Sequence, residues 1–118
     1  MSLSELDLAR LRDTLEQRLL ALRASSQATA DERRPVELDQ ASVGRLSRMD
    51  AMQVQAMAVA SERMRAAEIR KIEAAIARID AGDYGYCVTC GEEIAAKRLI
   101  VDPVVATCIG CATAAPRR

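Results

Sequence analysis

The chain changes character at the stretch Gly82-Asp83-Tyr84-Gly85-Tyr86-Cys87-Val88-Thr89-Cys90-Gly91. Cys87 and Cys90 are followed by a second C-x-x-C pair, Cys108 and Cys111, and these two pairs contain all 4 cysteines of the chain. Two such pairs at this separation are a strong zinc signal, because a two-residue spacer lets one turn supply two corners of a tetrahedral site. We therefore predict one Zn²⁺ bound by Cys87, Cys90, Cys108 and Cys111.

The predicted role of this zinc is structural. A shell of four thiolates leaves no open coordination position for water or substrate. Residues 83–112 contain few apolar side chains, so the metal is expected to supply much of the folding energy of this segment. Two disulfides would fit poorly in a cytosolic chain, and a redox C-x-x-C would need no second pair. An iron–sulfur cluster remains an alternative to zinc at a site of four cysteines.

Upstream of Gly82 the apolar residues recur at helical spacing. One stripe consists of Leu8, Leu11, Leu15, Leu19 and Leu22, and a second consists of Ile69, Ile72, Ile76 and Ile79. Ser2 and Glu5 have the spacing of a capping box at the start of the first helix. The second helix is expected to run from about Ser47 to Ala81, a length of about 52 Å, and to stop at Gly82.

Two long helices with narrow apolar stripes predict an antiparallel coiled-coil hairpin. Pairing the stripes, with Leu11 opposite Ile72, places the turn near residue 42, between Pro35 and Gly44. The alternative is that both stripes face the core of a compact helical bundle. The fold class is thus mainly α, a long antiparallel coiled-coil hairpin over 1–82 with its tip at about 35–46, followed by a small C4-type zinc finger and short tail over 83–118.

Composition supports a thin helical structure. The chain is 50% hydrophobic, yet only 2% of its residues are aromatic, and Phe, Trp and His are absent. Alanine provides much of the apolar content, so a large core of the kind found in a sandwich, a barrel or an α/β enzyme is disfavoured. Without His, a Gly-rich phosphate loop or an open metal position, we expect no catalytic activity.

Charge and hydropathy limit the partners and the compartment. The chain has 17 Lys+Arg against 17 Asp+Glu, so it has no global basic field for nucleic acid. Zinc bound by four thiolates changes the formal net charge from zero to −2. No apolar run approaches a membrane span, and the first residues lack the pattern of a signal peptide, so a cytoplasmic protein is expected.

The finger also resembles a known family. The residues that carry the resemblance are the run 82–94, Arg98-Leu99, Pro103 and Cys108-Ile109-x-Cys111, which are similar to the DksA/TraR family of C4-type zinc-finger regulators. The resemblance implies a bacterial protein that binds RNA polymerase. Family members insert the coiled-coil tip into the secondary channel of the polymerase and alter open promoter complexes without reading DNA.

The tip motif of the well-studied members is two Asp three positions apart, with Ala two positions after the second. Asp39-Gln40-Ala41 reproduces the second half, but Val36 stands at the position of the first Asp. Counting back from Cys87 without gaps gives a different tip, Gly44–Met49. Asp39 is equally well read as a turn residue or helix cap. The candidate partner-binding residues are Glu37, Asp39, Gln40, Ala41, Arg45 and Asp50.

The resemblance also bears on guanosine tetraphosphate. Responsive members carry an Arg immediately before the proline of the finger, where this chain has Asp102 before Pro103. Lys71 fits the family pattern, but Ala112 follows the last cysteine where Lys can occur. An anionic nucleotide would meet fewer cations, so a weak or absent response is expected.

Two other functions compete with the polymerase-binding interpretation. A zinc ribbon that binds nucleic acid weakly would need a basic surface, and residues 87–118 hold only Lys97, Arg98, Arg117 and Arg118 against three acids. A zinc-finger coiled-coil adaptor could use Met49, Met52, Met57 and Met64 as an adaptable contact face. At helical spacing such methionines are more often core filler, which is the expectation here.

Overall fold

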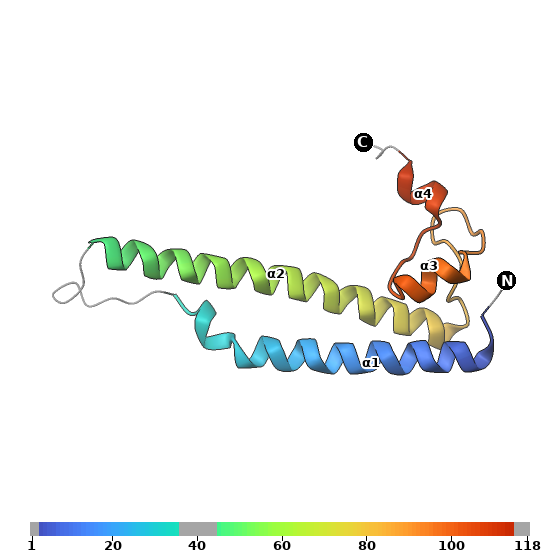
Figure 1. Ribbon diagram of the computed structural model, residues 1–118, viewed down its shortest axis with the longest axis horizontal. Helices are drawn as coiled ribbons and strands as arrows, with labels where there is room; N and C mark the ends of the chain where they lie inside the picture. The colour runs from blue at the N-terminus through green and yellow to red at the C-terminus, as the bar shows by residue number, and fades with distance from the viewer. Residues whose placement is uncertain (1–2, 36–44, 115–118) are drawn as a thin grey trace. The chain divides into compact units, whose positions relative to one another are not determined.

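The computed structural model describes residues 3–35 and 45–114, with the side chains of Arg45 and Leu46 outside the description. Its elements are α1 (Glu5–Ala28), the 3-10 turn η1 (Ala30–Arg33), α2 (Arg45–Ala81), α3 (Ala96–Val101) and α4 (Ile109–Thr113) (Figure 1). In these ranges there is no strand, only an isolated antiparallel bridge between Tyr86 and Glu93. The mainly α prediction is confirmed. No helix here combines the length and apolarity that a membrane crossing requires.

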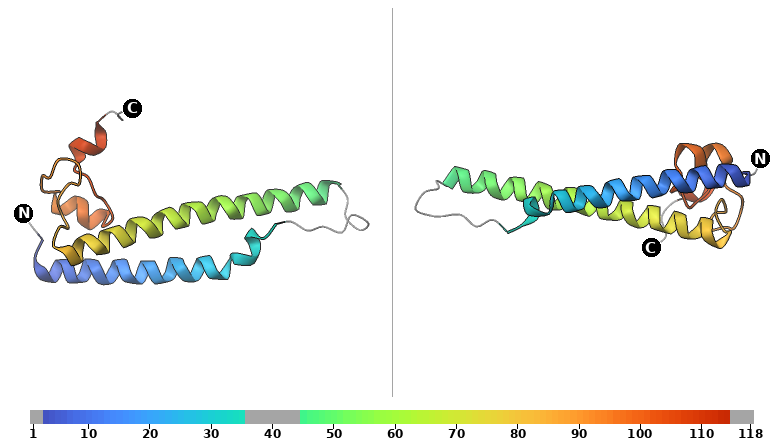
Figure 2. Two further views of the ribbon diagram at one scale, coloured as in Figure 1. Left: turned by 180° about the vertical axis from the view of Figure 1, so that it is seen from behind. Right: turned by 90° about the horizontal axis from the view of Figure 1, so that it is seen from below.

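The chain divides into two compact units. The finger unit combines residues 1–19 with 70–118, and the central unit consists of residues 20–69. In each of them a segment of α1 lies beside an antiparallel segment of α2 (Figure 2).

The start of α1 corrects the predicted cap. Ser4 and Asp7 form the reciprocal pair, in which the Ser4 amide donates to Asp7 Oδ2 at 3.2 Å and the Asp7 amide donates to Ser4 Oγ at 3.1 Å. This is the geometry of a capping box, two residues later than the predicted Ser2–Glu5 pair. Because α1 begins at Glu5, that residue occupies the first helical position and cannot reach back as a capping acid.

The finger unit has an apolar helix–helix core. Leu15, Ile72 and Ala75 are completely inaccessible to solvent, and Leu19 is 9% exposed. At the surface of this helix pair Arg12 binds Asp80 through two hydrogen bonds, Nε to Oδ1 at 2.7 Å and Nη2 to Oδ2 at 2.8 Å. The predicted stripes therefore do form the core of this pair, with Ala75 allowing close approach of the two backbones.

The C-terminus of α2 is fixed by its own backbone. The Gly82 amide donates to the Ile79 carbonyl at 3.2 Å, and the Asp83 amide donates to the Arg78 carbonyl at 2.9 Å. These two bonds make a Schellman motif, which requires a left-handed residue after the helix, and Gly82 has φ +80°. The predicted stop at Gly82 is confirmed, and the observed start at Arg45 lies two residues before the predicted Ser47.

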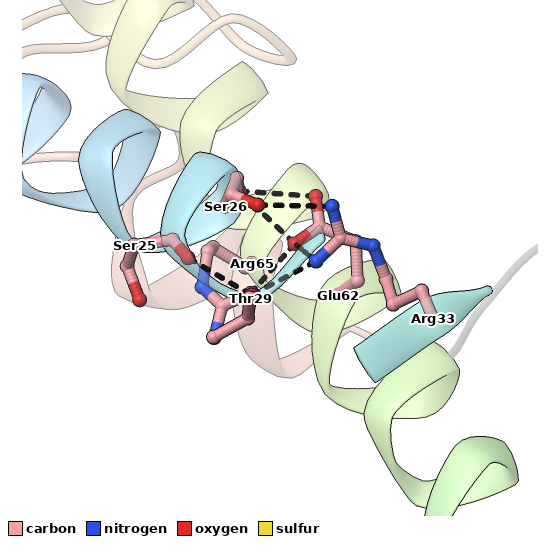
Figure 3. A network of polar contacts seen from close by, with 6 residues as sticks. All are labelled: Ser25, Ser26, Thr29, Arg33, Glu62 and Arg65. Atoms are coloured by element: carbon pink, nitrogen blue, oxygen red, sulfur yellow. Dashed lines mark hydrogen bonds and ion pairs between the residues drawn. The ribbon is translucent and has the colours of Figure 1, made fainter. Parts of the chain in front are cut away.

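The central unit is held together by polar contacts. Of its side chains that the structure describes, at positions 20–35 and 47–69, none is buried. Instead Ser26 Oγ donates to both Glu62 carboxylate oxygens at 3.0 Å, and Arg33 and Arg65 lie within 3.2 Å and 2.6 Å of Glu62 Oε1 (Figure 3). A single carboxylate thus joins the α1–η1 segment to α2.

These contacts also correct the predicted register. Under the predicted pairing Ser26 would lie opposite residues 57–58, and Arg12 opposite residues 71–72. The structure pairs Ser26 with Glu62 and Arg12 with Asp80, which is a shift of at least one helical turn. The physical reason is that an apolar stripe looks the same after a slide of one turn, so the polar cross-helix pairs decide the register.

The methionines are not core filler. Met49, Met52, Met57 and Met64 are 56%, 54%, 63% and 75% exposed. The expectation that they pack inside a helical pair is wrong, because the inward positions of this part of α2 are taken by polar residues such as Gln55 and Glu62. Gln55 Nε2 donates to the Arg33 carbonyl at 3.3 Å.

Candidate metal centre

The first cysteine pair sits at the end of a small β-like hairpin. The Ile94 amide donates to the Gly85 carbonyl at 2.7 Å, and the Cys87 amide donates to the Glu92 carbonyl at 2.8 Å. The turn closes where the Gly91 amide donates to the Cys87 carbonyl at 2.9 Å, and Gly91 takes φ +78°, a conformation that favours glycine. This local backbone places Cys87 and Cys90 on one tight turn.

The second pair is carried by α4. Cys108 is the N-cap of this helix, and its Sγ accepts a hydrogen bond from the Cys111 amide at 3.4 Å. The two cysteine segments are tied together because the Val88 amide donates to the Ala106 carbonyl at 2.9 Å. Each pair is thus formed by local backbone, and the Val88–Ala106 hydrogen bond helps to hold the two pairs side by side.

Three side chains of the finger are buried beside the cysteine segments in sequence. Tyr84, Ile94 and Leu99 are 7%, 3% and 1% exposed. Tyr84 Oη donates to the Pro103 carbonyl at 2.8 Å, and burial of the phenol raises the pKa of Tyr84. Arg98 Nε donates to the Thr107 carbonyl at 3.0 Å, which anchors the residue that precedes Cys108. The finger therefore has a small core of its own, into which one of the two tyrosines is inserted.

The four sulfurs converge. The Sγ atoms of Cys87, Cys90, Cys108 and Cys111 all lie within 4.8 Å of one another. Cys90 Sγ and Cys108 Sγ are 3.7 Å apart, and a tetrahedral zinc with Zn–S bonds of about 2.3 Å requires S···S distances of about 3.8 Å. No disulfide joins these four cysteines, in agreement with the expectation that two disulfides fit this chain poorly. The donor set fits zinc in both chemistry and spacing.

The protein environment shifts the pKa values of the cysteine thiols in opposite directions. Amide hydrogen bonds from Cys90 and Cys108 lower the pKa of Cys87 to about 6, because they stabilise the thiolate. Hydrogen bonds with the other three cysteine sulfurs, first that of Cys108, raise the pKa of Cys111 to about 12. Four sulfurs this close repel as anions, which is the electrostatic environment that a divalent cation relieves.

The structure describes only two of the six predicted tip residues. Glu37, Asp39, Gln40 and Ala41 lie outside the described residues. Arg45 is the first residue of α2, and Asp50 is exposed one turn later on the same helix.

Sequence reasoning missed the Glu62 cluster, although a signal was present. The first stripe continues at helical spacing from Leu22 through Ser26 and Thr29 to Arg33, and the second stripe continues upstream from Ile69 by seven residues to Glu62. The helix faces that carry the two apolar stripes therefore become polar toward residues 33 and 62. Arg33 Nη1 also donates to Thr29 Oγ1 at 2.9 Å, and Arg33 Nη2 donates to the Ser26 carbonyl at 2.9 Å (Figure 3).

Comparison with known proteins identifies the finger. Residues 82–117 match the family model of the prokaryotic dksA/traR C4-type zinc finger. The RNA polymerase-binding transcription factor DksA of Haemophilus influenzae is 46% identical over 50 residues, which are 42% of this chain and 34% of that protein. The factor of the same name from Escherichia coli K12 is 42% identical over 50 residues, 42% of this chain and 33% of that protein. The match thus spans about a third of the length of these relatives.

A solved structure resembles more of the chain. Transcription factor DksA2 from Pseudomonas aeruginosa superposes with a TM-score of 0.73, covering 92% of this chain and 82% of that one at 23% sequence identity. At this identity the likeness establishes the fold, a helical hairpin with a C-terminal four-cysteine finger, and it does not by itself assign an activity.

Proposed function

Because residues 82–117 match the model of the prokaryotic dksA/traR C4-type zinc finger, we propose that this chain is a DksA-like regulator that binds bacterial RNA polymerase and modulates transcription initiation. The observation that carries the proposal is the joint presence of this finger and the helical hairpin. The finger matches relatives named as RNA polymerase-binding transcription factors, and the hairpin matches the fold of DksA2.

In this proposal the zinc has a structural role. Cys87, Cys90, Cys108 and Cys111 hold it, and its bound charge relieves the repulsion between their sulfurs. Four protein ligands leave no position for a reacting molecule, so the finger organises the base of the hairpin and performs no catalytic step.

The hairpin delivers the contact with the polymerase. A helix of 37 residues extends about 55 Å, so a pair of helices reaches far into a narrow secondary channel while displacing little volume. The tip that enters the channel carries the acidic candidates Glu37 and Asp39, with Gln40 and Ala41 beside them, and Arg45 and Asp50 flank it on α2. Channel entry requires no contact with DNA, which agrees with the balanced charge of the chain. A polymerase partner also places the protein in the cytoplasm.

Guanosine tetraphosphate is expected to have little effect on this regulator. Asp102, the exposed residue before Pro103, adds a negative charge where responsive family members have a cation. Lys71 is exposed and cationic, but Ala112 offers no charge at the end of the second cysteine pair. One cation without its neighbours gives a weak site for a highly charged nucleotide.

The test combines binding and transcription. Purified zinc-loaded protein is titrated against bacterial RNA polymerase core enzyme, and open-complex lifetime is measured in parallel. We expect saturable binding and a changed lifetime, with Asp39→Asn abolishing the effect on lifetime while keeping binding. Asp50→Asn tests the competing acidic candidate on α2, and loss of the lifetime effect in Asp50→Asn but not in Asp39→Asn would make Asp39 the wrong tip residue. Absence of binding to core enzyme, together with salt-dependent DNA binding in a gel shift, would reject the proposal in favour of a nucleic-acid-binding finger.

A further inference from the structure

Arg33, the last residue of η1, is tied to α2 through both its side chain and its main chain. Its Nη1 lies 3.2 Å from Glu62 Oε1 (Figure 3), and its carbonyl accepts a hydrogen bond from Gln55 Nε2 at 3.3 Å. The guanidinium also donates to Thr29 Oγ1 and to the Ser26 carbonyl, both at 2.9 Å. The position of η1 along α2 is therefore fixed at Arg33.

The adjacent arginine is held differently. The side chain of Arg34 is 77% exposed, against 22% for Arg33, and it pairs with Asp31 of the same 3-10 turn at 3.2 Å. A pair between residues three positions apart does not relate η1 to α2. The two neighbouring arginines therefore differ in one respect that can be tested: Arg33 bridges to the other helix, and the Arg34–Asp31 pair is local.

The contacts of Glu62 determine alignment more than stability. The side chains of Arg33, Glu62 and Arg65 are 22%, 24% and 18% exposed, so solvent screens their attraction. Apolar residues in place of such a cluster often stabilise a fold as well or better. An apolar pair, however, tolerates a slide of one helical turn. A carboxylate that accepts from Ser26 and meets Arg33 and Arg65 makes these contacts in a single alignment.

The connection between η1 and α2 does not impose this alignment. Helix α2 begins at Arg45, ten residues before Gln55, so Arg33 is held about 15 Å along the axis from the start of the helix. Twelve peptide units join Arg33 to Arg45, and they can span about 40 Å when extended. A slide of η1 by one turn, about 5.4 Å, is well within this reach. The contacts at Glu62 and Gln55 therefore decide where the chain leaves α2.

We propose that Glu62 is a positioning residue of this regulator: it holds Arg33, which sets the point along α2 from which the chain runs into the candidate tip residues 37–41. This role rests on the proposed function, in which the tip acts inside the polymerase channel. A displacement of one turn, about 5.4 Å, is far larger than the roughly 1 Å misplacement that already impairs a reacting centre. Glu62 thus governs the effect on open complexes through Arg33, without contacting the polymerase itself.

The experiment separates binding from effect. Full-length, zinc-loaded protein is titrated against RNA polymerase core enzyme, and open-complex lifetime is measured with each variant at a saturating concentration. In Glu62→Gln the dissociation constant should change by less than about fivefold, since a screened ion pair contributes little. The effect on lifetime should fall by about tenfold or more. Arg33→Gln should give the same pattern, and Arg34→Gln, the matched control at the adjacent arginine, should act as wild type does.

A charge exchange tests whether the contact between Arg33 and Glu62 is responsible. Arg33→Glu alone sets two carboxylates against each other and should abolish the effect on lifetime. Combination with Glu62→Arg restores an opposite-charge pair at the net charge of the wild type, and it should recover most of the effect. A residue that only stabilised the helix pair would change binding and lifetime together. Far-ultraviolet circular dichroism and zinc content verify that each variant is folded.

Four outcomes would reject the positioning role of Glu62. Wild-type protein that neither binds core enzyme nor changes open-complex lifetime contradicts the proposed function, and this role with it. If the wild type is active and Glu62→Gln is equally active, the proposed function stands and the role of Glu62 alone is wrong. Equal losses of binding and effect, with no recovery in the exchanged pair, would make Glu62 a direct polymerase contact. A loss in Arg34→Gln as large as in Arg33→Gln would assign the effect to local positive charge.

Discussion

The finger unit and the central unit use different physical means to hold two segments of helix together. In the finger unit Leu15 and Ile72 are fully buried, and four sulfurs converge beside a small core around Leu99. In the central unit no side chain that the structure describes is buried, and the carboxylate of Glu62 takes the place of a core. Apolar burial and metal binding contribute much stabilising free energy, but apolar burial does not select one register of the two helices. The polar cluster contributes less free energy, but it fixes which residues of the two helices face each other.

This difference predicts an order of stability. The finger unit should be the last part of the molecule to open, and the central unit should exchange its amide protons through local opening events. Five tests address this contrast, in order of decreasing expected effect.

Loss of zinc should have the largest effect. Cys108→Ser or chelation removes a metal that contributes about 10–16 kcal/mol in zinc-finger peptides, so residues 83–113 should unfold. Tyr84 and Tyr86 are the only aromatic residues of the chain, so near-ultraviolet circular dichroism reports on the finger alone. We expect that signal to vanish. Thr89→Ser, a substitution within the same turn, is the control, and an unchanged tyrosine signal in metal-free Cys108→Ser would show that the finger folds without metal.

A cavity in the core between α1 and α2 should have the next largest effect. Ile72→Ala or Leu15→Ala removes a completely buried side chain and should lower the free energy of unfolding by about 2–5 kcal/mol. Leu20→Ala, at a position 66% exposed, should change it by less than about 0.5 kcal/mol. Urea titration followed at 222 nm measures both. Similar losses for the buried and exposed leucines would mean that the stripe does not form the core.

Removal of the central carboxylate should act locally. Glu62→Gln leaves Arg33 and Arg65 without their anionic partner, so amide exchange should accelerate over residues 20–34 and 47–69 and stay unchanged around Leu99. Asp50→Asn, at an exposed acidic residue of the same helix, supplies the matched control. Faster exchange throughout the chain, or none in the central unit, would contradict the division into a metal-held and a carboxylate-held unit.

The same carboxylate predicts a pH dependence. Burial disfavours its ionised form, but hydrogen bonds from Arg65 and Ser26 and the charge of Arg33 outweigh this, so the pKa of Glu62 lies below its ordinary value of 4.5. The ionised group therefore stabilises the central unit above pH 4.5, and this contribution is lost as the pH falls through the lower folded-state pKa. Acceleration of exchange in the central unit below pH 4.5 should be absent in Glu62→Gln.

The Arg12–Asp80 pair should have the smallest effect. Its geometry is bidentate, but the side chains of Arg12 and Asp80 are 35% and 53% exposed, and ion pairs that solvent reaches contribute little to stability. Arg12→Gln should lower the melting temperature only slightly, and the difference from wild type should shrink further at high salt. A large, salt-independent loss of stability would mean that this pair is as important as the core.

Much of the metal centre could be predicted from the sequence, because it is built locally. A C-x-x-C turn, a glycine after it and a second C-x-x-C at the start of a short helix specify the sulfur positions within a few residues of each cysteine. The small core of Tyr84, Ile94 and Leu99 was less accessible to prediction, because these residues are distant from one another in sequence and only the folded finger brings them together.

The sequence by itself determined the two long helices, the stop of the second at Gly82 and the convergence of the four cysteines, since each depends on local spacing and backbone preference. Tertiary structure decided the register of the hairpin, the inward position of Glu62 and the outward position of the methionines. Helical periodicity shows which residues share a face, but a stripe can slide by one turn without changing its pattern. The selection between those slides came from contacts between residues far apart in the chain, Ser26 with Glu62 and Arg12 with Asp80.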